Sequence, residues 1–121
     1  MNEYKRLPES ELDIMLAVWT QKSPTTAPQI LERLDRPLTA SALHSYLKRL
    51  EEKGYLTCEK QGKTNSYRAL VTRGEYESQE GRSVLEKLYE GSLKRFAASL
   101  HDGGSLSQED VAELRAFLDT L

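Results

Sequence analysis

The sequence predicts a mainly α-helical fold with one small antiparallel sheet near the middle of the chain. Three observations lead to this prediction. Apolar residues recur at helical spacing in three short segments of the first half. Two short strand-like runs follow, joined by a polar turn that contains glycine. From about residue 74 the spacing is helical again. Three helices and a hairpin are the layout of a winged helix-turn-helix domain, here followed by a C-terminal helical dimerisation region.

The first helix is expected from about Pro8 to Gln21. Proline suits the first turn of a helix, because the N–H that it lacks would have no partner there. One apolar stripe follows, made of Leu12, Met15, Leu16 and Trp19. Around Pro24 the helical pattern is broken, and a very short strand can lie there. The second helix is expected to begin at Thr26 as its N-cap, with Gln29 completing a T-x-x-Q capping box.

The third helix is expected to be amphipathic and to have Thr39 as its N-cap. Its buried stripe consists of Leu43, Tyr46, Leu47 and Leu50. Gly54 is a typical signal for the end of a helix. Two strands are expected at residues 55–60 and 66–70, with a Gly-containing turn over 61–65 between them.

Helical spacing then continues over residues 74–100. Gly81 and Gly91 are expected to weaken that helix and to bend or divide it. Gly103-Gly104 is a clear break. The segment Ser107-Gln108-Glu109-Asp110 predicts the capped start of a last helix.

We therefore expect two parts, a winged-helix domain over residues 1–73 and a helical region over residues 74–121. The second part carries too little apolar surface to form a core of its own, and a second copy of the chain is the simplest partner. The residues expected in that dimer interface are Leu85, Leu88, Tyr89, Leu93, Phe96, Leu114, Phe117 and Leu118.

Charge is distributed unevenly along the chain. Residues 38–73 contain seven basic and three acidic side chains, whereas the whole protein has a net charge of −2. The third helix and the hairpin are therefore basic on an otherwise acidic protein, which favours contact with phosphate and opposes indiscriminate binding.

A major groove of DNA admits one helix, and residues near the N-terminus of that helix reach the base edges. The residues expected to face the bases are the small or polar ones opposite the apolar stripe: Ser41, Ala42, His44 and Ser45. Those expected to contact phosphate are Thr39, Lys48, Arg49, Lys60, Lys63 and Arg68. The pattern predicts a homodimer that reads an inverted repeat in double-stranded DNA.

Two plainer interpretations remain open for the same residues. Ser, Ala, His and Lys are ordinary on a solvated helix face, and lysine also protects an exposed strand edge from pairing with another chain. A winged-helix module that docks an acidic protein, with no role in DNA binding, would have the same basic face.

Other residues suggest no further chemistry. The aromatic side chains Trp19, Tyr46, Tyr55 and Tyr67 lie on apolar stripes or strands and are expected to pack in the core. The single cysteine, Cys58, is expected to be a buried, inert thiol, and the lack of a disulfide partner favours the cytoplasm. No metal site, cofactor, enzymatic motif, secretory leader or membrane span is expected.

Several blocks of the sequence resemble the penicillinase-repressor family of the BlaI/MecI/CopY type. They are Leu7-Pro8-Glu9-Ser10-Glu11-Leu12-Asp13-Ile14-Met15, Leu38-Thr39-Ala40-Ser41-Ala42-Leu43, Leu47-Lys48-Arg49-Leu50-Glu51-Glu52-Lys53-Gly54-Tyr55-Leu56, Leu88-Tyr89-Glu90-Gly91-Ser92 and Leu106-Ser107-Gln108-Glu109-Asp110-Val111-Ala112-Glu113-Leu114. The resemblance covers nearly the whole chain in order. It implies a winged-helix repressor that dimerises through its C-terminal helices and binds a palindromic operator.

The resemblance does not extend to two switches known in that family. Some relatives are cleaved at an Asn-Phe bond, where this chain has Ser99-Leu100. Copper-responsive relatives carry Cys-x-Cys motifs near the C-terminus, and this chain has none. Neither route of release is therefore predicted here.

Overall fold

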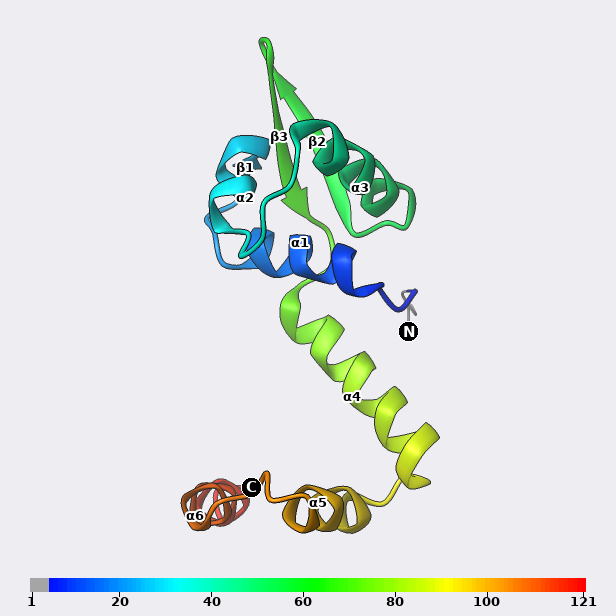
Figure 1. The fold of residues 1–121 in the computed structure, drawn as a ribbon, viewed down its shortest axis with the longest axis vertical. Coiled ribbons are helices and arrows are strands. Elements are labelled where there is room, and N and C mark those ends of the chain that lie inside the picture. The colour runs from blue at the N-terminus through cyan, green and yellow to red at the C-terminus, as the bar shows by residue number, and fades with distance from the viewer. Residues whose placement is uncertain (1–4) are drawn as a thin grey trace. The chain divides into compact units, whose positions relative to one another are not determined.

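The computed structural model describes residues 5–121, which form six helices and three strands in the order expected for a winged helix (Figure 1). The elements are α1 (Glu9–Trp19), β1 (Thr25–Thr26), α2 (Ala27–Arg33), α3 (Ala40–Glu52), β2 (Leu56–Gln61), β3 (Thr64–Ala69), α4 (Arg73–Tyr89), α5 (Leu93–Asp102) and α6 (Gln108–Leu118). The predicted fold class is confirmed.

The contacts divide the chain into two compact units, one ending at Glu80 and the other covering Gly81–Leu121. The first turns of α4 belong to the first unit, because Tyr76 is buried there. The same helix continues without interruption through Gly81 to Tyr89.

The first helices begin where the sequence predicts. The Thr26 hydroxyl accepts a hydrogen bond from the Gln29 backbone N–H, and the Gln29 side chain accepts one from the Thr26 N–H, which completes the capping box. At the start of α3 the Thr39 hydroxyl accepts from the Ala42 N–H at 3.0 Å. Local capping therefore fixes where the helix with the predicted base-facing residues begins.

The core of the first unit is formed by side chains from all three of its first helices and from the hairpin. Its fully buried members include Ile14, Met15, Ile30, Leu43, Leu47, Leu50, Tyr55 and Leu56. Tyr55 and Tyr67 are buried, and Trp19 and Tyr46 pack against this cluster, so the prediction that the aromatic rings belong to the core is confirmed. Because one stripe of α3 is buried in this way, its other face is left to solvent.

The sheet is antiparallel, with the strand order β1-β3-β2. Its hairpin is tighter than the sequence suggests. Gln61 pairs with Thr64, so only Gly62 and Lys63 form the turn. Gly62 has a φ of 64°, a conformation that glycine adopts without the steric cost of a side chain. Lys63 is thereby held at the tip of the wing.

The second unit contains two helix breaks of different origin. Gly91, with φ of 80°, separates α4 from α5, and Ser92 then caps α5 by accepting from the Arg95 N–H at 3.1 Å. Gly103 and Gly104 separate α5 from α6. Gly81, by contrast, lies inside α4 without ending it.

The start of α6 confirms the predicted cap. The Ser107 hydroxyl accepts from the Asp110 N–H, and the Asp110 carboxylate accepts from the Ser107 N–H at 2.9 Å. That backbone hydrogen bond lowers the pKa of the Asp110 carboxyl.

Candidate nucleic-acid interface

The outer face of α3 presents polar side chains to solvent. Ser41, His44 and Ser45 are exposed, whereas Ala42 is half-buried. The Ser45 hydroxyl donates to the Ser41 carbonyl at 3.3 Å, and its lone pairs remain available as acceptors. Three of the four residues predicted to face the bases are therefore accessible, and Ala42 offers only part of its methyl surface.

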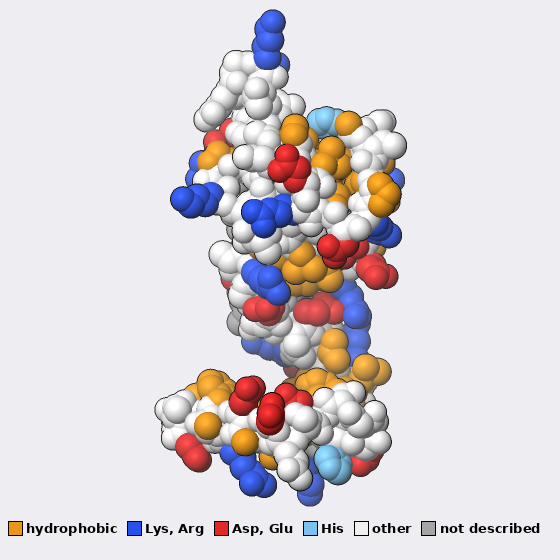
Figure 2. All heavy atoms as spheres, turned by 60° about the vertical axis from the view of Figure 1, so that its left-hand side comes forward, with side chains coloured by type: hydrophobic (Ala, Val, Ile, Leu, Met, Phe, Trp, Pro, Cys, Tyr) orange, Lys and Arg blue, Asp and Glu red, His pale blue; other side chains and the backbone are white. Residues whose placement is uncertain are grey.

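Cations flank this face on α3 itself and on the wing. Lys48 and Arg49 are exposed on α3, with the Arg49 guanidinium 5.6 Å from the centre of the Tyr46 ring. Lys60 and Lys63 are exposed on the hairpin, and basic side chains mark its tip at the top of Figure 2. Within residues 5–121 no ion pair engages Lys48, Lys60 or Lys63. These amines can therefore bind an external anion without first losing a partner.

Three other cations of residues 38–73 are already paired, one of them Arg73, which lies 3.3 Å from Glu77 on α4. On the wing, Arg68 lies 3.1 Å from the Glu59 carboxylate, and both side chains are largely exposed. Lys53, at the end of α3, lies 2.6 Å from Glu11, whose side chain is only 5% exposed. Arg68 can exchange its exposed partner for phosphate at small cost. Lys53 cannot, since its loss would leave a buried carboxylate without a partner.

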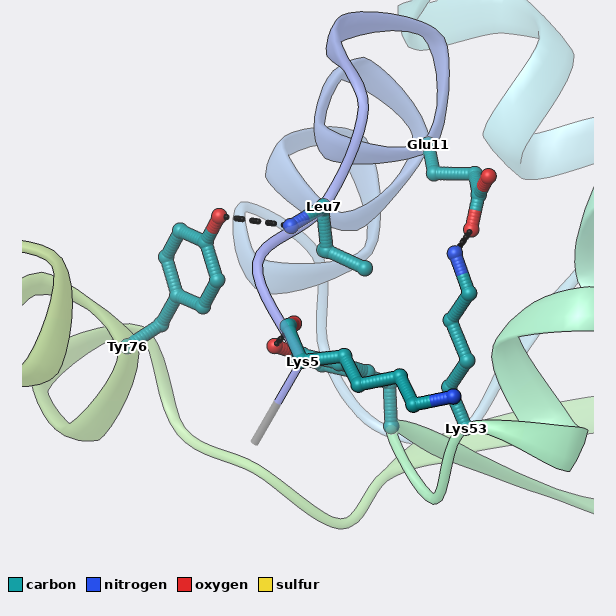
Figure 3. A network of polar contacts seen from close by, with 6 residues as sticks. Lys5, Leu7, Glu11, Lys53 and Tyr76 are labelled. Carbon is teal, nitrogen blue, oxygen red and sulfur yellow. Dashed lines mark hydrogen bonds and ion pairs between the residues drawn. The ribbon is translucent and has the colours of Figure 1, made fainter. Parts of the chain in front are cut away.

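Lys53 and Glu11 are residues whose role the sequence did not indicate. They are 42 positions apart, and no pattern in the sequence links them. Figure 3 shows the Lys53 side chain extending from the end of α3 to Glu11 on α1. The pair ties the end of α3 to α1, and it neutralises one positive charge of the predicted basic surface.

The prediction that Cys58 is buried is wrong, because the structure places it exposed on β2. Only the first residue of that strand, Leu56, is fully covered by the core, and the wing then extends beyond it. Cys58 lies opposite Tyr67, which is buried on β3. Burial, followed by the neighbouring thiol, raises the pKa of the Tyr67 hydroxyl.

Among the described side chains, no group of three or more His, Cys, Asp or Glu residues could hold a metal ion. None of the helices over residues 5–121 has the length and apolar character needed to cross a bilayer.

An exposed polar helix beside a basic wing defines the class of winged-helix DNA-binding proteins. Comparison with known proteins gives the family within that class. The chain belongs to the penicillinase repressor family, whose sequence model matches residues 7–120. This confirms the predicted family. It also confirms the prediction that the protein is a transcriptional repressor and not an enzyme.

Individual relatives agree with this assignment. The chain is 26% identical over 121 residues to the penicillinase repressor of Bacillus licheniformis, covering 98% of this chain and 94% of that protein. It is 23% identical over 120 residues to the methicillin resistance regulatory protein MecI of Mammaliicoccus sciuri, covering 98% of this chain and 97% of that protein.

Among solved structures, the chain resembles the monomeric form of B. licheniformis BlaI in complex with the blaP half-operator. The TM-score is 0.53 at 22% identity, covering 63% of this chain and 94% of that one. At this identity the likeness concerns the fold, which is that of a winged helix.

Proposed function

We propose that this repressor binds an inverted-repeat operator in the cytoplasm as a homodimer and blocks transcription by occupying the promoter. The observation that carries the proposal is the exposed face of α3, where polar side chains stand beside lysines that no acidic side chain of residues 5–121 engages.

The base-reading part of the proposal uses the first two turns of α3. Ser41 and the His44 ring can donate to or accept from base edges, and the Ser45 hydroxyl, which donates to the Ser41 carbonyl, can accept. The partly exposed methyl of Ala42 suits a thymine methyl group. Ser41, Ala42 and Ser45 are small, so the helix backbone can approach the floor of the groove closely.

The phosphate-binding part uses groups around that face. Thr39 is exposed and its hydroxyl caps the first turn of α3. Lys48 and Arg49 are exposed further along the same helix. On the wing, Lys60, Lys63 and Arg68 are all exposed. Such contacts fix register and orientation on the duplex and make the affinity depend on salt.

The dimer is proposed from the apolar surface of the C-terminal helices. The large, exposed apolar side chains there are Leu88, Leu93, Leu114, Phe117, Leu118 and Leu121. Figure 2 shows hydrophobic side chains on the surface of this unit. Three further residues of the expected interface, Leu85, Tyr89 and Phe96, are half-buried, and the last two pack their rings 5.1 Å apart. A monomer rarely leaves so much apolar surface uncovered, and a second copy would cover it.

Support also comes from the relatives. The BlaI structure described above holds a half-operator bound to the monomeric form of that protein. A palindromic site for a dimer would contain two such halves, with their centres about 34–36 Å apart.

The proposal is tested by selecting duplexes from a random library with the full-length protein and measuring their affinity by fluorescence anisotropy. We expect the selected sequences to share an inverted repeat, and we expect the affinity to fall steeply with salt. His44→Ala should change which bases are preferred. Binding that shows no sequence preference would contradict base reading by α3, and failure to bind any duplex would favour an acidic protein as the partner.

A further inference from the structure

The short segment that precedes α1 contacts two elements that are far away in the sequence. We call residues 5–7 the N-terminal strap. Its last member, Leu7, is buried in the core although it lies outside any helix or strand. The strap leads through Pro8 directly into α1.

On one side the strap is held by a residue that follows α3. Tyr55 follows α3 and is fully buried, and its N–H donates to the Leu50 carbonyl in that helix at 2.9 Å. Its hydroxyl donates to the carbonyl of Lys5, 50 positions away. The position of the strap is thereby tied to the end of α3.

On the other side the strap is held by the first turns of α4. The Leu7 N–H donates to the hydroxyl of Tyr76 at 3.2 Å, and both residues are buried (Figure 3). One turn further along, Glu80 lies 2.7 Å from the guanidinium of Arg6. The Tyr76 ring also meets the Tyr55 ring edge-on, with centres 5.9 Å apart. Each of the three strap residues therefore contacts either Tyr55, just after α3, or the first turns of α4.

This placement matters because α4 is one continuous helix from the first unit into the residues proposed for dimerisation. Along the chain, only residues 70–72 lie between the end of the wing at Ala69 and the start of α4 at Arg73. That connection is anchored to α1, because Val71 is buried and its carbonyl accepts from the Trp19 Nε1–H at 2.9 Å. The strap adds a buried hydrogen bond and an ion pair on the next two turns of α4.

We infer that the N-terminal strap is a positioning element that fixes the direction of α4 relative to α3, and that it thereby sets which half-site spacing the dimer accepts. This inference rests on the proposed operator-binding dimer. Tyr55 and Tyr76 act as positioning residues, because neither belongs to the surface proposed to touch DNA. Loss of either hydroxyl removes one contact of the strap and so loosens the direction of α4, while the ring contacts of Tyr76 with Trp19 and Tyr55 and the α3 face stay in place.

The variants that test the inference are Tyr76→Phe and Tyr55→Phe. Each removes one hydroxyl and keeps the buried ring, and Tyr76→Phe leaves the Leu7 N–H without its acceptor. The matched control is Tyr67→Phe, which removes a hydroxyl from another buried tyrosine of the same unit that lies on β3, away from the strap. Folding is monitored by the fluorescence of Trp19, the single tryptophan.

The probes are the selected duplex, the same duplex with one or two base pairs added or removed between its halves, and a single half-site. Each base pair rotates one half against the other by about 34°. Wild type should strongly prefer its native spacing. In both strap variants we expect that preference to fall about fivefold, the effect of one lost buried hydrogen bond, with half-site affinity unchanged. Tyr67→Phe should keep the wild-type preference.

Two results would overturn the inference while the proposed function stands. One is an unchanged spacing preference in both variants, and the other is a loss of half-site affinity with the spacing preference retained. If wild type bound no duplex at all, the proposed function would fall, and the inference with it. Should either tyrosine variant unfold, Glu80→Gln takes its place and is judged by the same two results. Its control is Glu77→Gln, at an exposed position of the same helix.

Discussion

At the scale of single residues, Lys63 separates contact with phosphate from contact with bases. It stands in the two-residue turn of the wing, with no acidic partner among the described residues. We expect Lys63→Ala to weaken binding about equally on every duplex, because a phosphate contact carries no sequence information. The slope of log affinity against log salt should fall by about one for each protomer. Anisotropy titrations at several salt concentrations measure both effects.

The control for this prediction is Lys22→Ala, which removes the same charge from an exposed residue outside the proposed interface. It should leave the salt slope unchanged. A Lys63→Ala protein that prefers a different operator would show that the wing reads bases, and Lys63 would then not be a phosphate contact alone.

At the scale of helices and strands, the features that the sequence predicted well are local ones. The caps at Thr26, Thr39 and Ser107 each depend on a hydrogen bond spanning three residues, so the pattern alone locates them. The apolar stripe of α3 follows from spacing within one helix. What a residue packs against elsewhere in the chain has no such signature.

The features that the sequence did not predict depend on distant partners. Leu7 and Tyr76 are 69 positions apart, and neither position has a pattern that indicates the other. Cys58 was expected to be buried because strands often are, yet the core covers only the beginning of β2. Gly81 and Gly91 looked alike in the sequence, but only Gly91 adopts a positive φ and ends its helix.

The Glu11–Lys53 pair connects α1 to the end of α3 and gives a prediction on stability. Lys53→Met should destabilise the first unit by about 3 kcal/mol, because it leaves the nearly buried Glu11 carboxylate without a partner. Urea denaturation followed by Trp19 fluorescence measures this cost. The double variant Glu11→Leu/Lys53→Met should recover most of it, since no buried charge remains.

The comparison variant for that pair is Arg36→Met. It breaks a similar contact between a cation and an α1 carboxylate, Asp13, but at 3.4 Å and with both side chains well exposed. Its cost should stay below about 1 kcal/mol. Equal costs for Lys53→Met and Arg36→Met would mean that the burial of Glu11 does not govern the strength of the pair.

At the scale of the whole molecule, the proposed dimer gives the two units different roles in affinity. One winged helix presents one short reading face, and a single half-site offers few specific contacts. In the proposed dimer, two copies joined through their C-terminal helices would make the second binding event intramolecular, which would raise the affinity for a paired site without any new contact to DNA. Whatever separates the copies would therefore release the operator while each winged helix remains folded.

Leu88→Asp tests this division of roles. Leu88 is 66% exposed, so a charged side chain there should not unfold a single chain, but it should oppose burial of the position against a second copy. We expect light scattering to give the mass of one chain, and we expect affinity for the full operator to fall to nearly that for a half-site. Leu70→Asp makes the same substitution at an exposed leucine of the first unit and should leave the dimer intact. A Leu88→Asp protein that still scatters as a dimer would remove the end of α4 from the interface, and the contact between copies would then have to be sought on α5 and α6.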